Sequence, residues 1–530
     1  MLFTSYTFIG FVFLLFALYY TVPARWQWRL LLAAGYVFYL ASGWKNCVFI
    51  LVTTVSTYVL ARRIGAYHMQ QESYLKEHKK EMSREQRKDY KAGIKRRQRR
   101  LLLAGLLLNF GILAVLKYTN FAIHNVNLLL SAAGSARQVP TADLLLPLGI
   151  SFYTFITMGY LIDVYRAKYP AEQSLGKLAL FVSFFPQLVQ GPINRFDDMK
   201  ETLFSPHKPD RQEIAFGLER MLWGYFKKLV IADRMLTGVT AIVGDPQTYG
   251  GIYVFVGMMF YALQLYADFT GGIDITIGIA QVLGIRVKEN FLRPYFSKNI
   301  AEYWRRWHIS LGSWFTEYIF YPVSVCQPML NLSRFSRKHL GDYVGKRMPV
   351  YMASLAVWFT TGIWHGASWN FVVWGLLNGL IIILSQECEP LYARFHRRFH
   401  VDGTFGYRLF QVVRTVLLMS SLRMLDCYRD VPLTFRMFGD MLLHSRPSQL
   451  FDGRLMSLGL TAADYGVLTA GTVVLVGASL LGRKGSVREM LSRKPAGGRW
   501  AAVYGLVLCT LVLGAYGVGY DSSQFIYNQF

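Results

Sequence analysis

A single histidine lies in the middle of a long uncharged stretch of this sequence. His365 stands between Gly362 and Gly366, and residues 348–386 contain no Asp, Glu, Lys or Arg over 39 positions. A straight helix of that length, at about 1.5 Å per residue, would be almost twice the roughly 30 Å hydrocarbon thickness of a membrane. The stretch must therefore break, and broken helices at membrane depth line cavities or lie buried in protein. His365 is thus a candidate general base in a polar cavity, although a histidine that binds a neighbouring carbonyl fits the same features. Two neighbouring candidates for lining this cavity are Trp364 and Asn370.

A second histidine follows a cluster of tryptophan and arginine residues. At helical spacing, one face of this segment carries Trp304, Trp307, His308 and Leu311. Arg305 and Arg306 then point elsewhere, and Asn290 precedes the segment. We interpret His308 as lining the site and the arginines as binding an anionic donor or acceptor. The alternative is interfacial anchoring, with tryptophan and arginine at the lipid boundary and His308 in the core.

Three further polar side chains interrupt apolar runs. Asp268 and Asp274 flank a Gly-Gly pair in the otherwise uncharged residues 250–285, which could form two membrane elements. Asp274 could cap the helix that follows the glycines, and we favour this structural role over chemistry. Gln187 lies in a proline- and glycine-containing segment, 185–195, which predicts a helix kink or end that lines a cavity.

Several classes of site are missing from the sequence. There is no P-loop, no GxSxG elbow, no HExxH and no Rossmann glycine pattern in a plausible context. The five cysteines are scattered and form no CxxC pair. We therefore expect no metal site, no bound cofactor and no nucleotide hydrolysis.

Composition places these segments in a membrane. The 530 residues are 53% hydrophobic and only 17% charged, with a mean hydropathy of +0.27, whereas soluble chains carry about 25% charged residues. The formal net charge of +25 lies in a few segments between apolar runs, a distribution typical of multi-span membrane proteins rather than of nucleic-acid binders. The apolar runs predict an all-α polytopic protein with about 11–14 transmembrane or re-entrant helices.

The basic segment over residues 62–100 sets the expected topology. It carries 14 Lys/Arg against 5 Asp/Glu, so the positive-inside rule makes it cytoplasmic and places the N-terminus outside. We expect this segment to act as an orientation signal and an amphipathic helix on anionic lipid. No segment is long and polar enough for a soluble domain, so we predict one membrane domain over residues 1–530. Its parts are the N-terminal spans 1–61, the basic segment 62–100, the core 101–386 and the C-terminal spans 387–530.

These motifs, in this order, resemble the membrane-bound O-acyltransferase (MBOAT) family. The likeness is greatest to its bacterial branch that modifies cell-surface polymers, the alginate O-acetylases and teichoic-acid D-alanyltransferases. The segments that carry the resemblance are 146–153, 185–192, 266–274, 304–311, 362–369 and 525–530. The sequence departs from the family pattern at Asn378, where a histidine is frequent, and in a basic insertion over residues 334–347.

The resemblance implies a fold, a reaction and partners. Helices form a ring around a central tunnel in such proteins, with a family histidine inside that matches His365 and a second one that matches His308. An acyl group would move from a cytosolic thioester, acetyl-CoA or a D-alanyl carrier protein, to a hydroxyl of an extracytoplasmic polysaccharide or teichoic acid. The transfer would be direct or through an accessory partner, an SGNH-type or small membrane protein. The expected location is the bacterial cytoplasmic membrane, and the chain length favours the O-acetylases.

A transporter or flippase for a lipid-linked glycan is the alternative class. It would need alternating access, usually built from internal repeats, and no repeat is visible in this sequence. An acyltransferase consumes its donor and labels its acceptor, whereas a flippase changes only the side of the membrane on which its substrate lies.

Overall fold

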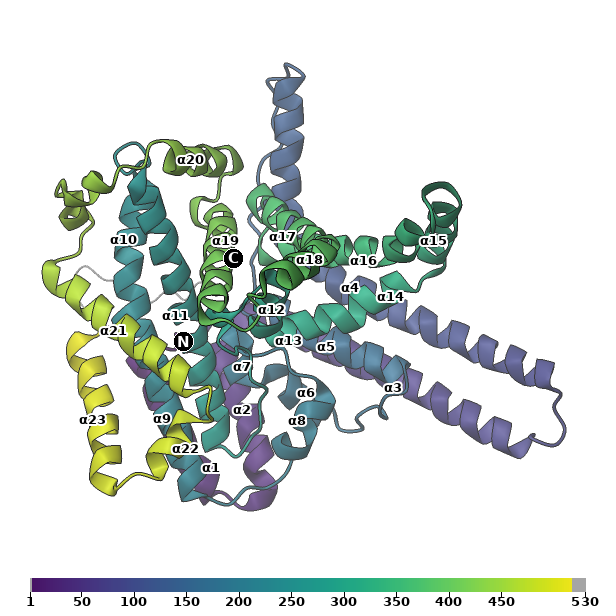
Figure 1. Cartoon of the computed structure of the whole chain (residues 1–530). Coiled ribbons are helices and arrows are strands. Elements are labelled where there is room, and N and C mark those ends of the chain that lie inside the picture. Colours follow the sequence, from purple (N-terminus) through teal and green to yellow (C-terminus); the bar gives the residue numbers. More distant parts are fainter. Residues whose placement is uncertain (1, 517–530) are drawn as a thin grey trace. The chain divides into compact units, whose positions relative to one another are not determined.

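The computed structural model describes residues 2–516, which form helices and no β-strand. Their contacts group the chain into two units, residues 1–214 with 279–288 and residues 215–278 with 289–530. The boundaries after residues 214 and 278 fall inside helices α9 (Arg211–Tyr225) and α11 (Ile252–Val282), and the boundary after residue 288 falls in a connecting segment (Figure 1). The motif over residues 525–530 lies outside the described residues.

The first unit contains helices of very different lengths. They are α1 (Tyr6–Thr21), η1 (Ala24–Trp26), α2 (Gln27–Leu40), α3 (Trp44–Glu77), α4 (Arg84–Ala132), α5 (Ile150–Tyr165), α6 (Leu175–Ser183), α7 (Phe185–Gln190), α8 (Phe196–Leu203) and the start of α9 (Arg211–Tyr225).

The second unit holds both candidate histidines. Its first elements are η2 (Phe226–Ala232), α10 (Asp233–Gly244), α11 (Ile252–Val282), η3 (Pro294–Phe296), α12 (Ile300–Arg306), α13 (Ile309–Phe315), η4 (Thr316–Phe320), α14 (Tyr321–Ser324) and α15 (Gln327–Leu340). They are followed by α16 (Asp342–His365), α17 (Trp369–Glu387), α18 (Glu389–Phe399), α19 (Phe405–Tyr428), α20 (Val431–Leu443), η5 (Pro447–Phe451), η6 (Arg454–Ser457), α21 (Ala462–Leu481), α22 (Val487–Ser492) and α23 (Ala496–Leu513).

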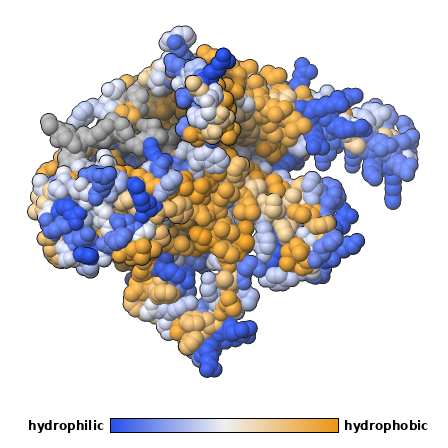
Figure 2. Space-filling view, turned by 90° about the horizontal axis from the view of Figure 1, so that it is seen from above, coloured by the Kyte–Doolittle hydropathy of each residue, from blue (hydrophilic) through white to orange (hydrophobic). Residues whose placement is uncertain are grey.

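Six helices of the described chain are long and apolar enough to cross a membrane, namely α3, α4, α11, α17, α21 and α23. Helix α1 is apolar but shorter. Figure 2 shows broad hydrophobic areas on the surface between hydrophilic ones, as expected where side chains face lipid. The prediction of an all-α, multi-pass membrane protein is therefore confirmed. The number of 11–14 membrane elements and the ring around a tunnel stay predictions.

The basic segment of the first unit is a helical hairpin. Helix α3 runs without interruption from apolar residues into the basic segment, and α4 runs from the basic segment into apolar residues. The two helices lie side by side (Figure 1). Ser83 begins α4 with a capping box, because its Oγ accepts from the Gln86 N–H and the Gln86 Oε1 accepts from the Ser83 N–H. The rings of Tyr74 and Tyr90 stack at 4.4 Å across the hairpin. The basic residues thus extend two membrane-span candidates, and the expected role of this segment as an orientation signal on anionic lipid stays a prediction.

The predicted kink around Gln187 is present. Helix α6 ends at Ser183 and α7 begins at Phe185. Buried Gln187 holds this break together, since its Nε2 donates to the Phe181 carbonyl at 2.8 Å and its Oε1 accepts from Asn194 at 3.2 Å. Its amide therefore satisfies a backbone carbonyl that the helix end leaves open and links this carbonyl to the Asn194 side chain.

The Gly-Gly pair over residues 271–272 does not divide a helix, contrary to the sequence-based expectation. Helix α11 is continuous, so Asp274 lies inside it and caps nothing. A Cβ at Gly271 would lie 2.9 Å from the Gly224 carbonyl oxygen, and one at Gly224 would lie 2.5 Å from that of Gly271. Glycine is therefore needed because α9 and α11 touch backbone to backbone at this point.

Candidate functional site

His365 stands at the end of a helix, as the sequence predicts. Helix α16 stops at His365, Gly366 has an extended backbone, and α17 begins three residues later. A Cβ at Gly366 would lie 2.2 Å from the Phe371 ring, and one at Gly362 would lie 2.4 Å from the Phe371 carbonyl oxygen. The two glycines therefore let α17 turn back tightly against α16, which fixes His365 at their junction.

Aromatic rings surround the His365 imidazole, which is only 8% exposed. The ring centroid of Trp374 lies 4.8 Å away and that of Trp364 lies 5.0 Å away, both edge-on. Phe371 stacks more distantly at 6.4 Å. This shell holds the imidazole in one orientation and excludes bulk water from it.

His308 lies in a second helix break, between α12 and α13. Its backbone is left-handed, with φ 49° and ψ 53°, a conformation that costs about 1–3 kcal/mol outside glycine. Asn290 fixes this turn, because its carbonyl accepts from the Ile309 N–H at 3.0 Å and its Oδ1 accepts from the Ser310 N–H at 3.0 Å. The prediction of one helical face over residues 304–311 was wrong, since the helix ends at Arg306 and restarts at Ile309.

Both histidines contact the ring of the same tryptophan, Trp364. The ring centroid of Trp364 lies 5.9 Å from His308 and 5.0 Å from His365, edge-on to both. His308 also contacts Phe269 at 5.0 Å and is 3% exposed. Residues that are 57 positions apart in the chain, His308 and His365, are thus brought into one buried aromatic cluster.

Arg423 belongs to this cluster and was missed from the sequence. Its guanidinium lies 4.8 Å above Trp374, 5.2 Å from Trp307 and 5.7 Å from Trp304. A desolvated cation over such rings is attracted by about 2 kcal/mol, and Asp426 adds an ion pair at 3.6 Å. The available signal was an arginine in the apolar run of α19, because an ionisable group at membrane depth marks a functional or structural site.

The remaining residues of the WRRWH segment have different surroundings. Trp304 donates from Nε1 to the Asn378 Oδ1 at 3.1 Å, which ties α12 to α17. Arg306 pairs with Glu302 at 2.6 Å within α12, and Arg305 is exposed. Among the described residues, no hydrogen bond or ion pair links either arginine to His308 or His365. Their proposed role in binding an anionic donor therefore stays a prediction.

Asn370 is held by the helix junction. Its Nδ2 donates to the Leu425 carbonyl at 3.1 Å, and its Oδ1 accepts from the Ser368 hydroxyl. Helices α17 and α19 are joined by this amide.

The predicted site residue Gln187 belongs to the first unit, where it stabilises the helix break between α6 and α7.

Both predicted carboxylates are neutralised by lysines that the sequence analysis missed. The π-helical segment η2 turns two successive lysines into the protein. Lys227 contacts Asp274 at 2.5 Å and Thr270 at 2.8 Å, and Lys228 contacts Asp268 at 2.7 Å and Asp233 at 2.7 Å. The preferred structural interpretation of Asp268 and Asp274 agrees with these ion pairs.

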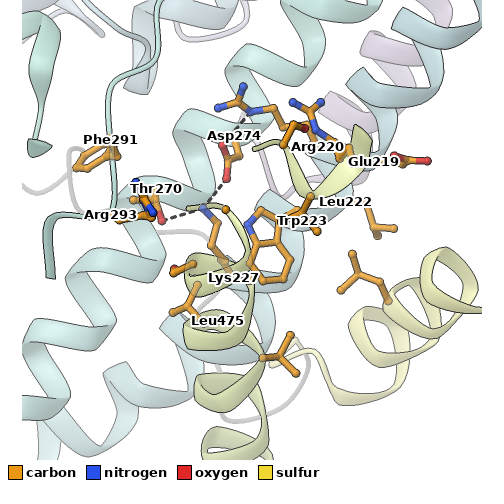
Figure 3. A pocket seen from close by; sticks show the side chains of 18 of the residues that line it. Glu219, Arg220, Leu222, Trp223, Lys227, Thr270, Asp274, Phe291, Arg293 and Leu475 are labelled. Atoms are coloured by element: carbon orange, nitrogen blue, oxygen red, sulfur yellow. Dashed lines mark hydrogen bonds and ion pairs between the residues drawn. The ribbon is translucent and has the colours of Figure 1, made fainter. Parts of the chain in front are cut away.

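A cavity of about 620 Å³ lies next to this charged layer (Figure 3). Neither histidine lines it, but Phe291 does, and the Phe291 ring centroid lies 6.5 Å from that of His308. Phe291 therefore contacts both the cavity and the His308 side of the aromatic cluster.

The arrangement suits acyl transfer in a dry environment. A buried imidazole can take the proton of an attacking hydroxyl, and nearby N–H groups can stabilise the oxyanion that forms on the acyl carbon. A shell of indole rings excludes the water that would hydrolyse a thioester.

Comparison with known proteins agrees with this chemistry. A model of the MBOAT, membrane-bound O-acyltransferase family, matches residues 170–335. The probable alginate O-acetylase AlgI of Azotobacter vinelandii is 34% identical over 393 residues, which cover 73% of this chain and 69% of that protein. The peptidoglycan O-acetyltransferase of Helicobacter pylori is 31% identical over 321 residues, covering 56% and 57%. The teichoic acid D-alanyltransferase of Streptococcus thermophilus is 29% identical over 256 residues, covering 46% and 58%.

The site and these relatives define a multi-pass membrane acyltransferase. The chain belongs to the membrane-bound O-acyltransferase family. It spans about two thirds of the length of the alginate O-acetylases that it matches.

Proposed function

We propose that this protein O-acetylates an extracytoplasmic polysaccharide from the bacterial cytoplasmic membrane, using a cytosolic acetyl thioester as donor. The two relatives named as O-acetylating enzymes match over longer parts of the chain than the D-alanyltransferase does. The basic hairpin over residues 62–100 supports a cytoplasmic face for the donor. The polymer, and an accessory partner of the SGNH type or a small membrane protein, belong to the same proposal.

One observation carries the assignment of the site. His308 and His365 share contacts with Trp364 inside a buried aromatic cluster. In the proposed step, His365 takes the proton from the acceptor hydroxyl while the hydroxyl oxygen bonds to the acyl carbon. The carbon–sulfur bond then breaks, and the thiolate leaves with the proton that His365 returns. His308 orients the donor carbonyl, and Arg423 holds the tryptophans that shape the site.

The test uses the full-length protein in liposomes with a matched histidine control. We expect His365→Ala to lower donor consumption by about 100-fold or more, because general-base catalysis contributes about 10²–10⁴-fold. His339→Ala removes an exposed histidine of the same unit and should leave turnover unchanged. Labelled acetyl-CoA and labelled D-alanyl carrier protein are offered separately, with glycan acceptor, and free thiol and acylated polymer are measured.

The two donors distinguish the candidate reactions. Turnover of acetyl-CoA alone supports the O-acetylase proposal, whereas turnover of the D-alanyl carrier alone replaces it by D-alanyl transfer. Normal turnover by a folded His365→Ala protein would remove His365 from the mechanism. A wild-type protein that consumes neither donor but moves a lipid-linked glycan across the bilayer would support the flippase alternative.

A further inference from the structure

The cavity in the second unit has one polar and one apolar side. Its polar side is formed by α9, η2, α11 and residues 289–293, where Figure 3 shows Lys227 and Asp274 pointing toward one another. Its apolar side is formed by α21 and α23, which contribute Leu475, Val503 and Leu506. A cavity of about 620 Å³ with this division suits an amphiphilic ligand.

Most charges on the polar side neutralise one another. Arg220 binds Asp274 at 2.9 Å and Glu289 at 2.6 Å, and Lys227 binds the second oxygen of Asp274. Two cations and two anions thus form a closed network. Arg293 is different, because it lines the cavity and makes no recorded hydrogen bond or ion pair from its side chain among the described residues.

The backbone fixes Arg293 at this place. Its φ of 51° is left-handed, a strained value for a residue other than glycine. The Leu292 N–H donates to the Arg306 carbonyl at 2.9 Å, and the Phe296 N–H donates to the Arg293 carbonyl at 3.2 Å. The backbone is fixed in this way, and the Arg293 guanidinium, which lines the cavity beside an apolar wall, is suited to a phosphate group.

A basic loop forms the rim of the cavity. Residues 482–495 connect α21 with α23 and carry five Lys/Arg against one Glu. The positive-inside rule places such a loop at the cytoplasmic surface, where anionic lipids are attracted to basic segments. Helix α22 lies in this loop, and its residues Val487, Arg488 and Leu491 line the cavity.

We propose that this cavity binds an anionic phospholipid, with its phosphate at Arg293 and an acyl chain along Leu475, Val503 and Leu506. The occupant is a lipid because the cavity is lined by the Arg293 cation, by the apolar residues of two candidate spans and by residues of a basic loop. The ligand would lie against Phe291, whose ring centroid is 6.5 Å from that of His308. This site goes beyond the proposed acyl transfer, which does not require a bound lipid.

Native mass spectrometry of the full-length protein tests the proposal without donor or acceptor. The protein is reconstituted in vesicles of equal phosphatidylglycerol and phosphatidylcholine, and the ratio of the two lipids retained after gentle delipidation is measured. Arg293→Gln should lower the retained phosphatidylglycerol-to-phosphatidylcholine ratio by about tenfold, as expected for the loss of one charge-assisted contact. Arg483→Gln removes an exposed charge from the same loop and should leave the ratio unchanged.

A second variant tests the cavity itself. Ala478 lines the apolar side, so Ala478→Trp should fill the space and abolish retention of both lipids. An unchanged lipid ratio in Arg293→Gln, or an equal fall in Arg483→Gln, would overturn the proposal in favour of diffuse surface attraction. Displacement of phosphatidylglycerol by millimolar coenzyme A would overturn it too, because the cavity would then take the phosphate of a thioester donor. These lipid measurements can fail while His365-dependent acyl transfer stands, and the reverse also holds.

Discussion

Replacing Lys228 with methionine removes a buried cation that pairs with two buried carboxylates, Asp233 and Asp268. The side chains of Lys228, Asp268 and Asp233 are 0%, 0% and 2% exposed, and Nζ lies 2.7 Å from an oxygen of each acid. Removing one partner of a buried ion pair costs about 3–5 kcal/mol because the remaining charge is left uncompensated. At about 1.4 kcal/mol per factor of ten, the unfolded fraction should rise by about two to three and a half orders of magnitude.

The assay compares unfolding midpoints in detergent. A second variant separates the loss of one ion pair from the loss of the lysine that both acids share. Asp268→Asn leaves the pair of Lys228 with Asp233 intact, so we expect it to cost about 1–2 kcal/mol, close to the loss of one hydrogen bond. Lys484→Met removes an exposed lysine of the same unit and should leave the midpoint unchanged. The reasoning is refuted if Lys228→Met unfolds like the wild type, or if Asp268→Asn is as damaging as Lys228→Met.

Two further predictions concern other parts of the second unit. A Cβ at Gly375 would lie 2.3 Å from the Trp358 carbonyl oxygen, so Gly375→Val should separate α16 from α17, cost about 1–3 kcal/mol in an unfolding assay and abolish turnover. The exposed neighbour Leu376→Val should change neither, and an unaltered Gly375→Val protein would contradict the close approach. In the loop before α21, hydrogen bonds from Arg454 lower the pKa of Asp452 from 3.8 to about 2. A lowered carboxyl pKa stabilises at neutral pH and loses its effect as the pH falls from about 4 to about 2. Hydrogen exchange should therefore show protection of the 447–458 loop falling over this range in the wild type, and lower protection at pH 7 in Asp452→Asn than in the wild type. Equal protection of the two proteins at pH 7 would contradict this prediction.

The sequence indicated the helices well because apolar runs and their breaks are local. The end of α16 at His365 follows from an apolar stretch too long for one span, with glycines at the point where the chain must turn. The continuity of α11 could not be seen in this way, because the role of Gly271 depends on Gly224 of another helix. The break at His308 was hidden for a similar reason, since Asn290 stabilises it from 18 positions away.

Half of the site could be predicted from the sequence. His365, His308 and Trp364 lie in short motifs with unusual composition, whereas Arg423 comes from a helix 58 positions beyond His365 and reaches the cluster only in three dimensions. The lysines of η2 were missed because helical periodicity places neighbours on different faces. A π-helical turn, with its wider spacing, allows both to point inward.

The hairpin of α3 and α4 has a practical consequence for imaging. At about 1.5 Å per residue, the 34 residues of α3 extend about 51 Å and the 49 residues of α4 about 74 Å. Both exceed the roughly 30 Å core of a bilayer, so the hairpin reaches well beyond the lipid on rigid, uninterrupted helices. A compact protein fused between Lys80 and Glu81 at its tip would follow the orientation of the spans. Such a fusion would give particle images of this 60.7 kDa chain an alignment mark outside the micelle.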